Sequence, residues 1–122
     1  MARILVIDDE PDIRALLETA LRLDGHEVVL AGDGVEGLRR QREAPADLVI
    51  VDIFMPEKEG IETIMEMRQE FPRLPIIAMS GGGRSGNTNF LAQALHLGAT
   101  RAIAKPFDHR MMLEIVHEVL VR

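Results

Sequence analysis

Short apolar runs alternate along the chain with longer segments in which apolar residues recur every three or four positions. Four of the five runs are almost entirely apolar, as expected of parallel strands that are covered on both faces. The predicted strands are residues 4–7, 28–30, 48–51, 76–79 and 102–104. Alternation of strand and helix in this way predicts an α/β domain built on a parallel sheet.

Five helices are predicted between and after these strands. The first begins at Pro11, which suits the first turn of a helix, and ends before Gly25. The second (33–43) has a weaker pattern, the third covers 59–71, the fourth ends at Gly98, and the fifth starts near Phe107. The side chains expected to face the core are Ile13, Leu16, Leu17, Ala20, Leu21, Val35, Leu38, Ile61, Ile64, Met65, Phe90, Leu91, Ala94, Leu95, Met111, Met112, Ile115, Val116 and Val119.

The length and composition limit the remaining possibilities. A chain of 122 residues has room for one domain, which we place at 1–122, and its 47% hydrophobic residues can fill one core. The sequence contains no cysteine. This excludes disulfides, thiolate metal ligands and a thiol nucleophile.

The charge balance bears on possible partners. Fourteen basic and 20 acidic residues give a net charge of −6, which disfavours nucleic acid as a direct ligand. No apolar run approaches the roughly 20 residues that span a bilayer. We therefore expect a monomeric cytoplasmic protein without a membrane partner. The four histidines, His26, His96, His109 and His117, fall in turns or helices away from the strand ends, and we expect them to be solvated.

Polar residues follow four of the five predicted strands. Asp8 and Asp9 follow the first, Asp52 the third, Ser80 the fourth and Lys105 the fifth. In a parallel sheet with right-handed crossovers these strand ends share one edge, where ligands bind. Carboxylates about 5 Å apart repel by about 3 kcal/mol per pair at an effective dielectric constant of 20, so the cluster needs a cation. Hard oxygen ligands favour Mg²⁺.

This set of groups predicts phosphoryl transfer. The metal and Lys105 would neutralise charge on the phosphoryl oxygens, Ser80 would donate a hydrogen bond, and one carboxylate would attack in line. A single Asp after a strand is more often a helix cap or turn residue, and we assign Asp12 and Asp33 to that role. Capping does not account for four separate strand ends that carry this set.

Four sequence motifs resemble the receiver domain of two-component response regulators, over essentially the whole chain. They are Ile7-Asp8-Asp9-Glu10, Val51-Asp52-Ile53-Phe54-Met55-Pro56, Met79-Ser80 and Lys105-Pro106-Phe107. The resemblance implies a flavodoxin-like, doubly wound five-stranded parallel sheet, with strand order 2-1-3-4-5 and five flanking helices.

The resemblance also implies individual roles. Asp52 is the implied phosphoacceptor, Asp9 and Asp52 bind Mg²⁺ directly, and Asp8 acts mainly through metal-bound water. The backbone carbonyl of Phe54 is a further implied ligand. Ser80 and Lys105 contact the phosphoryl oxygens, and the peptide bond after Lys105 is typically cis in this family.

The function implied is that of a signalling module that catalyses its own phosphorylation and dephosphorylation. It would take a phosphoryl group from a sensor histidine kinase or a histidine phosphotransferase. It would then act on a downstream protein through a changed surface, or pass the phosphoryl group on.

Two features depart from the family pattern. Ala102 stands where the family commonly has Tyr or Phe, so the usual readout of the fourth-strand hydroxyl is either weaker or uses other residues. The glycine-rich segment 81–86 lengthens the connection after Ser80, and we expect it to act as a switch loop.

Three alternatives remain at this point. A Mg²⁺-dependent aspartyl-phosphate phosphohydrolase would need a second Asp two residues after the nucleophile, where this chain has Phe54. A flavodoxin-like cofactor carrier would need aromatic side chains for stacking, and the chain has no Trp or Tyr. A receiver domain cut from a longer regulator would have the same sequence features as a stand-alone receiver.

Overall fold

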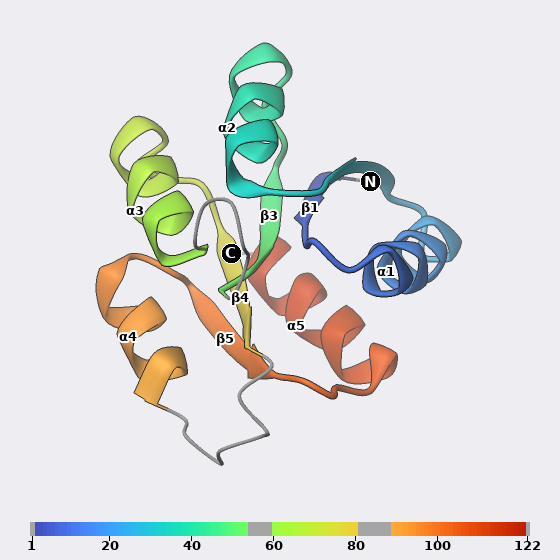
Figure 1. Ribbon diagram of the computed structural model, residues 1–122. Coiled ribbons are helices and arrows are strands. Elements are labelled where there is room, and N and C mark those ends of the chain that lie inside the picture. Colours follow the sequence, from blue (N-terminus) through green and yellow to red (C-terminus); the bar gives the residue numbers. More distant parts are fainter. Residues whose placement is uncertain (1, 54–59, 81–88, 122) are drawn as a thin grey trace.

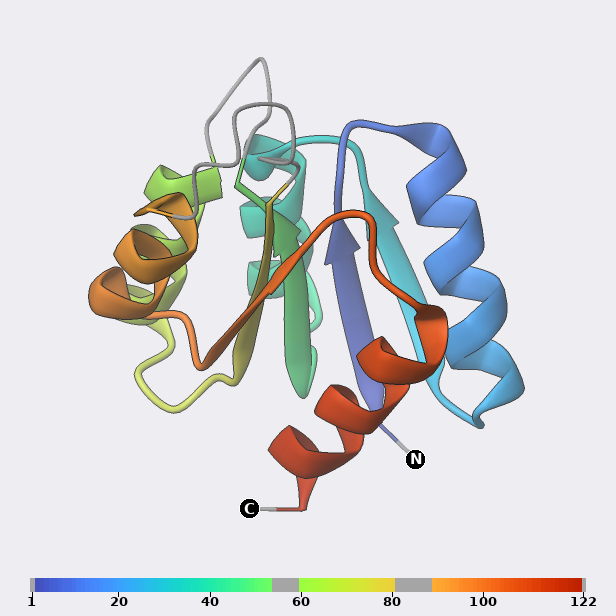
Figure 2. The same ribbon diagram turned by 90° about the horizontal axis from the view of Figure 1, so that it is seen from below.

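The computed structural model describes residues 2–53, 60–80 and 89–121. Five parallel strands form one sheet in the order β2-β1-β3-β4-β5, which confirms the predicted topology. The strands are β1 (Arg3–Ile7), β2 (Glu27–Ala31), β3 (Leu48–Asp52), β4 (Ile76–Ser80) and β5 (Arg101–Ala104). Their carboxyl ends share one edge of the sheet, and both ends of the chain lie toward the opposite edge (Figure 2).

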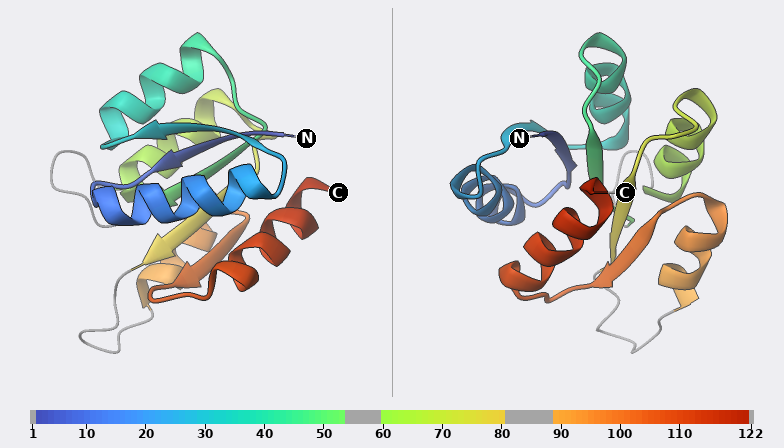
Figure 3. Two further views of the ribbon diagram at one scale, coloured as in Figure 1. Left: turned by 90° about the vertical axis from the view of Figure 1, so that its right-hand side faces the viewer. Right: turned by 180° about the vertical axis from the view of Figure 1, so that it is seen from behind.

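Helices cover both faces of the sheet (Figure 1). They are α1 (Pro11–Leu23), α2 (Gly34–Glu43), α3 (Gly60–Glu70), α4 (Asn89–Leu97) and α5 (His109–Leu120). Helices α1 and α5 lie side by side on one face, and α2, α3 and α4 cover the other, as Figure 3 shows from two further sides. None of the helices described here is long and apolar enough to cross a membrane.

The core is divided into two halves by the sheet. Alternate residues of β1 serve the two halves: Ile4 and Val6 pack with α1 and α5, whereas Leu5 and Ile7 pack toward α2 and α3. All four side chains are at most 1% exposed. Burial on both faces explains why the strands have continuous apolar sequences without polar alternation.

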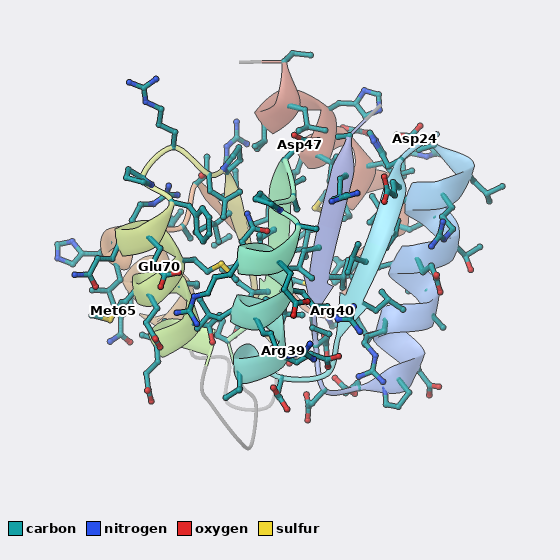
Figure 4. All side chains as sticks on the ribbon, turned by 90° about the horizontal axis from the view of Figure 1, so that it is seen from above. Asp24, Arg39, Arg40, Asp47, Met65 and Glu70 are labelled. Atoms are coloured by element: carbon teal, nitrogen blue, oxygen red, sulfur yellow. The ribbon has the colours of Figure 1, made fainter. Side chains whose placement is uncertain are left out.

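The helical periodicity identified the correct segments but assigned too many residues to the core. Leu16, Met65, Leu95 and Met111 are 45–48% exposed, and Val35 is 61% exposed, contrary to the sequence prediction. Four of them directly precede or follow a buried residue of the same helix, Leu17, Ile64, Ala94 and Met112. Successive helical residues point about 100° apart, so the neighbour of a buried residue lies at the margin of the packed face. Figure 4 shows Met65 on the outer side of α3.

Several helix ends follow the sequence signals. Gly98 follows α4 with φ +136°, and Gly25 follows the end of α1 with φ 92°, conformations that favour glycine. Asp33 caps α2, because its side chain accepts a hydrogen bond of 2.8 Å from the Glu36 amide. Helix α5 begins at His109, two residues later than predicted, since Asp108 is its N-cap. The side chains of Phe90 and Leu91 lie outside the described residues.

Two glycines allow helices to pack close to the carboxyl end of the sheet. A Cβ on Gly37 of α2 would overlap the Ile7 side chain, immediately before Asp8. A Cβ on Gly60, the first residue of α3, would overlap the carbonyl oxygen of Asp52 and the Cα of Ile53. The Gly60 amide also donates a 2.9 Å hydrogen bond to the Ile53 carbonyl oxygen. These contacts place the end of β3 tightly beneath α3.

The Gly60 contact can be tested by Gly60→Ala. Because the new methyl group meets backbone atoms that cannot rotate away, we expect the free energy of unfolding to fall by about 1–3 kcal/mol. The measurement is urea unfolding followed by circular dichroism. Gly32→Ala is the matched control, since the nearest atoms to its Cβ are side-chain atoms at 3.5 Å and 3.9 Å. Equal stability of the Gly60→Ala variant and the wild type would contradict the proposed close packing.

Candidate functional site

Backbone hydrogen bonds hold the carboxyl ends of the strands next to one another. The Asp8 amide donates to the Ala31 carbonyl oxygen at 3.1 Å, and the Ile53 amide donates to the Met79 carbonyl oxygen at 2.8 Å. The Lys105 amide donates to the Ser80 carbonyl oxygen at 2.6 Å. Sheet pairing therefore brings Asp8, Asp52, Ser80 and Lys105 to one edge, because each stands at or directly after a paired strand end.

The Lys105 ammonium lies among three carboxylates. Its Nζ is 2.8 Å from Asp8 Oδ2, 3.2 Å from Glu10 Oε1 and 3.4 Å from Asp52 Oδ2. Asp8 is fully buried and Asp52 is 3% exposed. Two residues with little access to water thus face one cation from Lys105, which directly follows β5 and is distant in the sequence.

Opposing effects act on the pKa of Lys105. Burial lowers this pKa, since it disfavours the charged form, but the hydrogen bond to Asp8 and the negative charges of Asp52 and Asp8 together outweigh burial. The hydrogen bond to Glu10 acts in the same direction. The net result is a pKa above the ordinary value, so the side chain carries its positive charge throughout the neutral range.

Local hydrogen bonds position Asp8. Its Oδ1 accepts a 2.9 Å hydrogen bond from the Glu10 amide, which leaves Oδ2 directed at Lys105. The Arg14 guanidinium, from the first turns of α1, donates a 2.7 Å hydrogen bond to the Asp8 carbonyl oxygen. No role for Glu10 or Arg14 was predicted from the sequence. An acidic residue two positions after Asp8 was the available signal for Glu10, whereas Arg14 carried none.

The remaining predicted site residues have different positions. Ser80 is buried as the last residue of β4. Asp9 is half-buried and does not belong to the group of carboxylates formed by Asp8, Glu10 and Asp52. The Lys105-Pro106 peptide bond is cis, as the resemblance implied. Phe54 lies outside the described residues, as does the glycine-rich segment 81–86.

The donor set fits a hard divalent cation. Asp8, Glu10 and Asp52 each offer a carboxylate oxygen, and these oxygens lie within 4.8 Å of one another. Oxygen ligands with a high negative charge are those that Mg²⁺ takes in proteins. Ammonium and metal would both reduce the repulsion among these groups.

One prediction about the histidines was wrong. The side chain of His26 is only 9% exposed, because the turn between α1 and β2 packs against the end of α5. The ring centroids of His26 and His117 of α5 are 6.3 Å apart in an edge-on arrangement. His96, His109 and His117 are exposed, as predicted.

Comparison with known protein families agrees with this fold. The family model described as "Response regulator receiver domain" matches residues 4–117. The chain belongs to the response regulator receiver domain family. A receiver domain is a signalling module of two-component systems, and phosphorylation and Mg²⁺ binding are typical of the family.

Curated relatives of this receiver domain are longer proteins. The present chain is 36% identical over 118 residues to the regulatory protein AtoC of Escherichia coli. This alignment covers 97% of the present chain and 25% of AtoC. The chain is 32% identical over 120 residues to the alkaline phosphatase synthesis transcriptional regulatory protein PhoP of Bacillus subtilis, covering 98% of this chain and 49% of PhoP. The receiver domain thus spans half or less of the length of these two relatives.

Solved receiver domains have the same fold. The receiver domain of NtrX from Brucella abortus superposes with a TM-score of 0.90 at 32% identity, covering 96% of this chain and 97% of that one. The chemotaxis protein CheY4 of Vibrio cholerae superposes with a TM-score of 0.88 at 29% identity, covering 98% of both chains. Receiver domains are phosphorylated by histidine kinases or phosphotransfer proteins.

The contacts of Lys105 predict a pH dependence. Because the pKa of Lys105 is raised by folding, its contribution to stability is complete below the unfolded value of about 10.5 and is lost as the pH rises through the folded pKa. Asp8→Asn removes the charge that accepts the 2.8 Å hydrogen bond, so we expect a lower folded pKa of Lys105 and an earlier alkaline loss of stability.

This pKa can be measured by NMR titration of the lysine side chains. The sequence contains only one other lysine, Lys58, and no Tyr or Cys that would titrate in the same range. Urea unfolding at several alkaline pH values gives the matching change in stability. The same Lys105 pKa in Asp8→Asn and the wild type would show that Asp8 does not hold the ammonium.

Proposed function

We propose that this receiver domain accepts a phosphoryl group on Asp52 from a phosphohistidine of a partner protein, in a Mg²⁺-dependent reaction. The observation that carries the proposal is the Lys105 ammonium, 3.4 Å from Asp52 Oδ2 at the buried end of the sheet. A cation held beside a carboxylate nucleophile is positioned to offset the charge that a phosphoryl group brings.

In the proposed step an Asp52 carboxylate oxygen attacks the phosphorus in line. An O–P bond forms, and the P–N bond breaks with its electron pair left on the imidazole nitrogen of the partner. The phosphoryl group on Asp52 then lies beside the Lys105 ammonium and carries more negative charge than the free carboxylate. The Ser80 hydroxyl, at the end of the neighbouring strand, donates a hydrogen bond to a phosphoryl oxygen. Hydrolysis of the aspartyl phosphate returns the domain to its starting state.

The residues proposed to hold Mg²⁺ are Asp9 and Asp52 directly, Asp8 through water, and the backbone carbonyl of Phe54. When bound, the ion neutralises negative charge on the transferred phosphoryl oxygens. The charges at this end of the sheet support a metal ion here, because the single Lys105 ammonium faces three carboxylates, of which Asp8 and Asp52 are buried. The assignment of Asp9 and Phe54 follows from the family resemblance.

Two features suggest how phosphorylation would alter the surface. Lys105 forms ion pairs with Asp8 and Glu10, which lie in the segment that leads into α1. The backbone of Asp52 packs against Gly60, the first residue of α3. A change in the charge at Asp52 would redistribute the Lys105 contacts between these segments. The proposed outcome is either recognition of the changed surface by a downstream protein or transfer of the phosphoryl group to another histidine.

The phosphoacceptor assignment can be tested by intact mass measurement. Incubation with acetyl phosphate and Mg²⁺ should add one phosphoryl group to the wild type and none to Asp52→Asn, because the amide lacks the nucleophilic carboxylate. Asp33→Asn is a suitable control, since Asp33 caps α2. Equal phosphorylation of Asp52→Asn, or none of the wild type, would contradict the proposal.

The metal ligands make a second prediction. Asp9→Ala should abolish measurable Mg²⁺ binding, since it removes one of two proposed direct carboxylate ligands, while Asp8→Ala should weaken binding less. Calorimetric titration is the appropriate measurement, because the chain has no Trp or Tyr whose fluorescence could report binding. Undiminished Mg²⁺ affinity in Asp9→Ala would remove Asp9 from the site.

A further inference from the structure

Three potential metal ligands converge at the end of the molecule opposite the phosphorylation site. Asp24 is the C-cap of α1, His26 lies in the turn before β2, and His117 lies in the last turn of α5. One ligand atom from each falls within 4.8 Å of the other two. Figure 4 shows Asp24 at this end, together with Asp47.

The distances define a compact group. Asp24 Oδ2 is 2.7 Å from His117 Nε2 and 3.4 Å from His26 Nε2. Tetrahedral ligands at the usual zinc–ligand bond lengths lie about 3.4 Å from one another. Small side-chain movements, mainly of the exposed His117, would therefore bring all three atoms onto one ion.

His26 provides an independent indication of a ligand. Its side chain is 9% exposed, and its Nε2 is buried and makes no hydrogen bond among the described residues. This nitrogen faces Asp24, and the His26 side chain also lines a hollow of about 430 Å³. The hollow is lined by Ala2, His26, Asp47, His117, Leu120 and Val121. A buried polar atom without a partner is costly and indicates a missing ion or water.

We propose that Asp24, His26 and His117 form a binding site for a borderline divalent transition metal such as Zn²⁺. Two imidazole nitrogens and one carboxylate oxygen are a donor set that suits such ions and does not suit Mg²⁺. Water fills the remaining coordination position on the exposed side, next to His117. The site is independent of the proposed phosphoryl transfer.

Two carboxylates lie in or beside this group. Asp24 Oδ2 lies within 3.4 Å of a nitrogen of each histidine, and Asp47 lines the hollow next to His26 and His117. Negative charge at this position favours a cation.

Metal binding has a defined consequence for His26. Its Nδ1 accepts a 3.3 Å hydrogen bond from the Ala2 amide, which places the ring proton on Nε2 in the metal-free state. Coordination through Nε2 moves that proton to Nδ1, so the contact with Ala2 must open. The NMR signal of the Ala2 amide should therefore respond when a metal binds His26.

The bound ion would add a shared ligand to the existing contact between Asp24 and His117. It would join the end of α1, the following turn and the last turn of α5, which lie side by side on one face of the sheet (Figure 3). An ion that binds only the folded state raises stability according to its concentration and affinity.

The proposal can be tested by calorimetric titration of the untagged full chain with Zn²⁺. Excess Mg²⁺ is present so that it fills the carboxylate site at the other end of the molecule. We expect one equivalent to bind. His117→Gln should weaken binding by at least about 10–100-fold, since even the loss of outer-shell partners costs about that much. His117 is 62% exposed, so this variant should fold normally. His26→Gln should have the same effect on affinity.

His96→Gln, an exposed histidine of α4, is the matched control and should bind Zn²⁺ like the wild type, as should Asp52→Asn. NMR should show shifts of the His26 and His117 Nε2 signals and of the Ala2 amide. The proposal fails if no equivalent binds, if His117→Gln binds as tightly as the wild type, or if His96→Gln or Asp52→Asn is the variant that loses binding.

Discussion

The contact between the Lys105 ammonium and the buried carboxylates of Asp8 and Asp52 is the interaction on which the site depends. Two acidic side chains with almost no access to water lie close together at the end of the sheet, and the Lys105 ammonium offsets their negative charge. The same charges raise the pKa of Lys105 despite its burial. The positive charge of Lys105 thus offsets the negative charges of Asp8 and Asp52, and a change of charge at Asp52 alters these contacts.

The parallel sheet places these charged side chains next to one another. Parallel pairing of β1, β3, β4 and β5 brings residues from positions 8 to 105 to one edge, and the hydrogen bond from the Lys105 amide to the Ser80 carbonyl oxygen fixes the last of them. Glycine at position 60 lets α3 press against the backbone of Asp52. The chain's membership of the receiver domain family agrees with this fold.

Most of the fold could be predicted from the sequence, because continuous apolar runs and helical periodicity directly reflect burial. The residues at the margins of helices could not: Met65 and Met111 fit the helical spacing, yet each lies about 100° from its buried neighbour and remains half exposed. The positions of Asp8, Asp52, Ser80 and Lys105 at one edge could be predicted, because each stands at or directly after the end of a recognisable strand. Those of Glu10, Arg14 and the buried His26 could not, since their roles depend on side-chain directions and on contacts between distant segments.

The most direct test of the account follows the Lys105 ammonium itself when the charge at Asp52 changes. NMR of the lysine Nζ signals can be recorded before and after adding Mg²⁺ with beryllium trifluoride, a phosphoryl mimic, with Lys58 as the internal reference. The account predicts a large shift of the Lys105 signal and a new contact between its Nζ and a fluorine atom, both absent in Asp52→Asn. An unchanged Lys105 signal in a wild-type protein that has bound the mimic would contradict it.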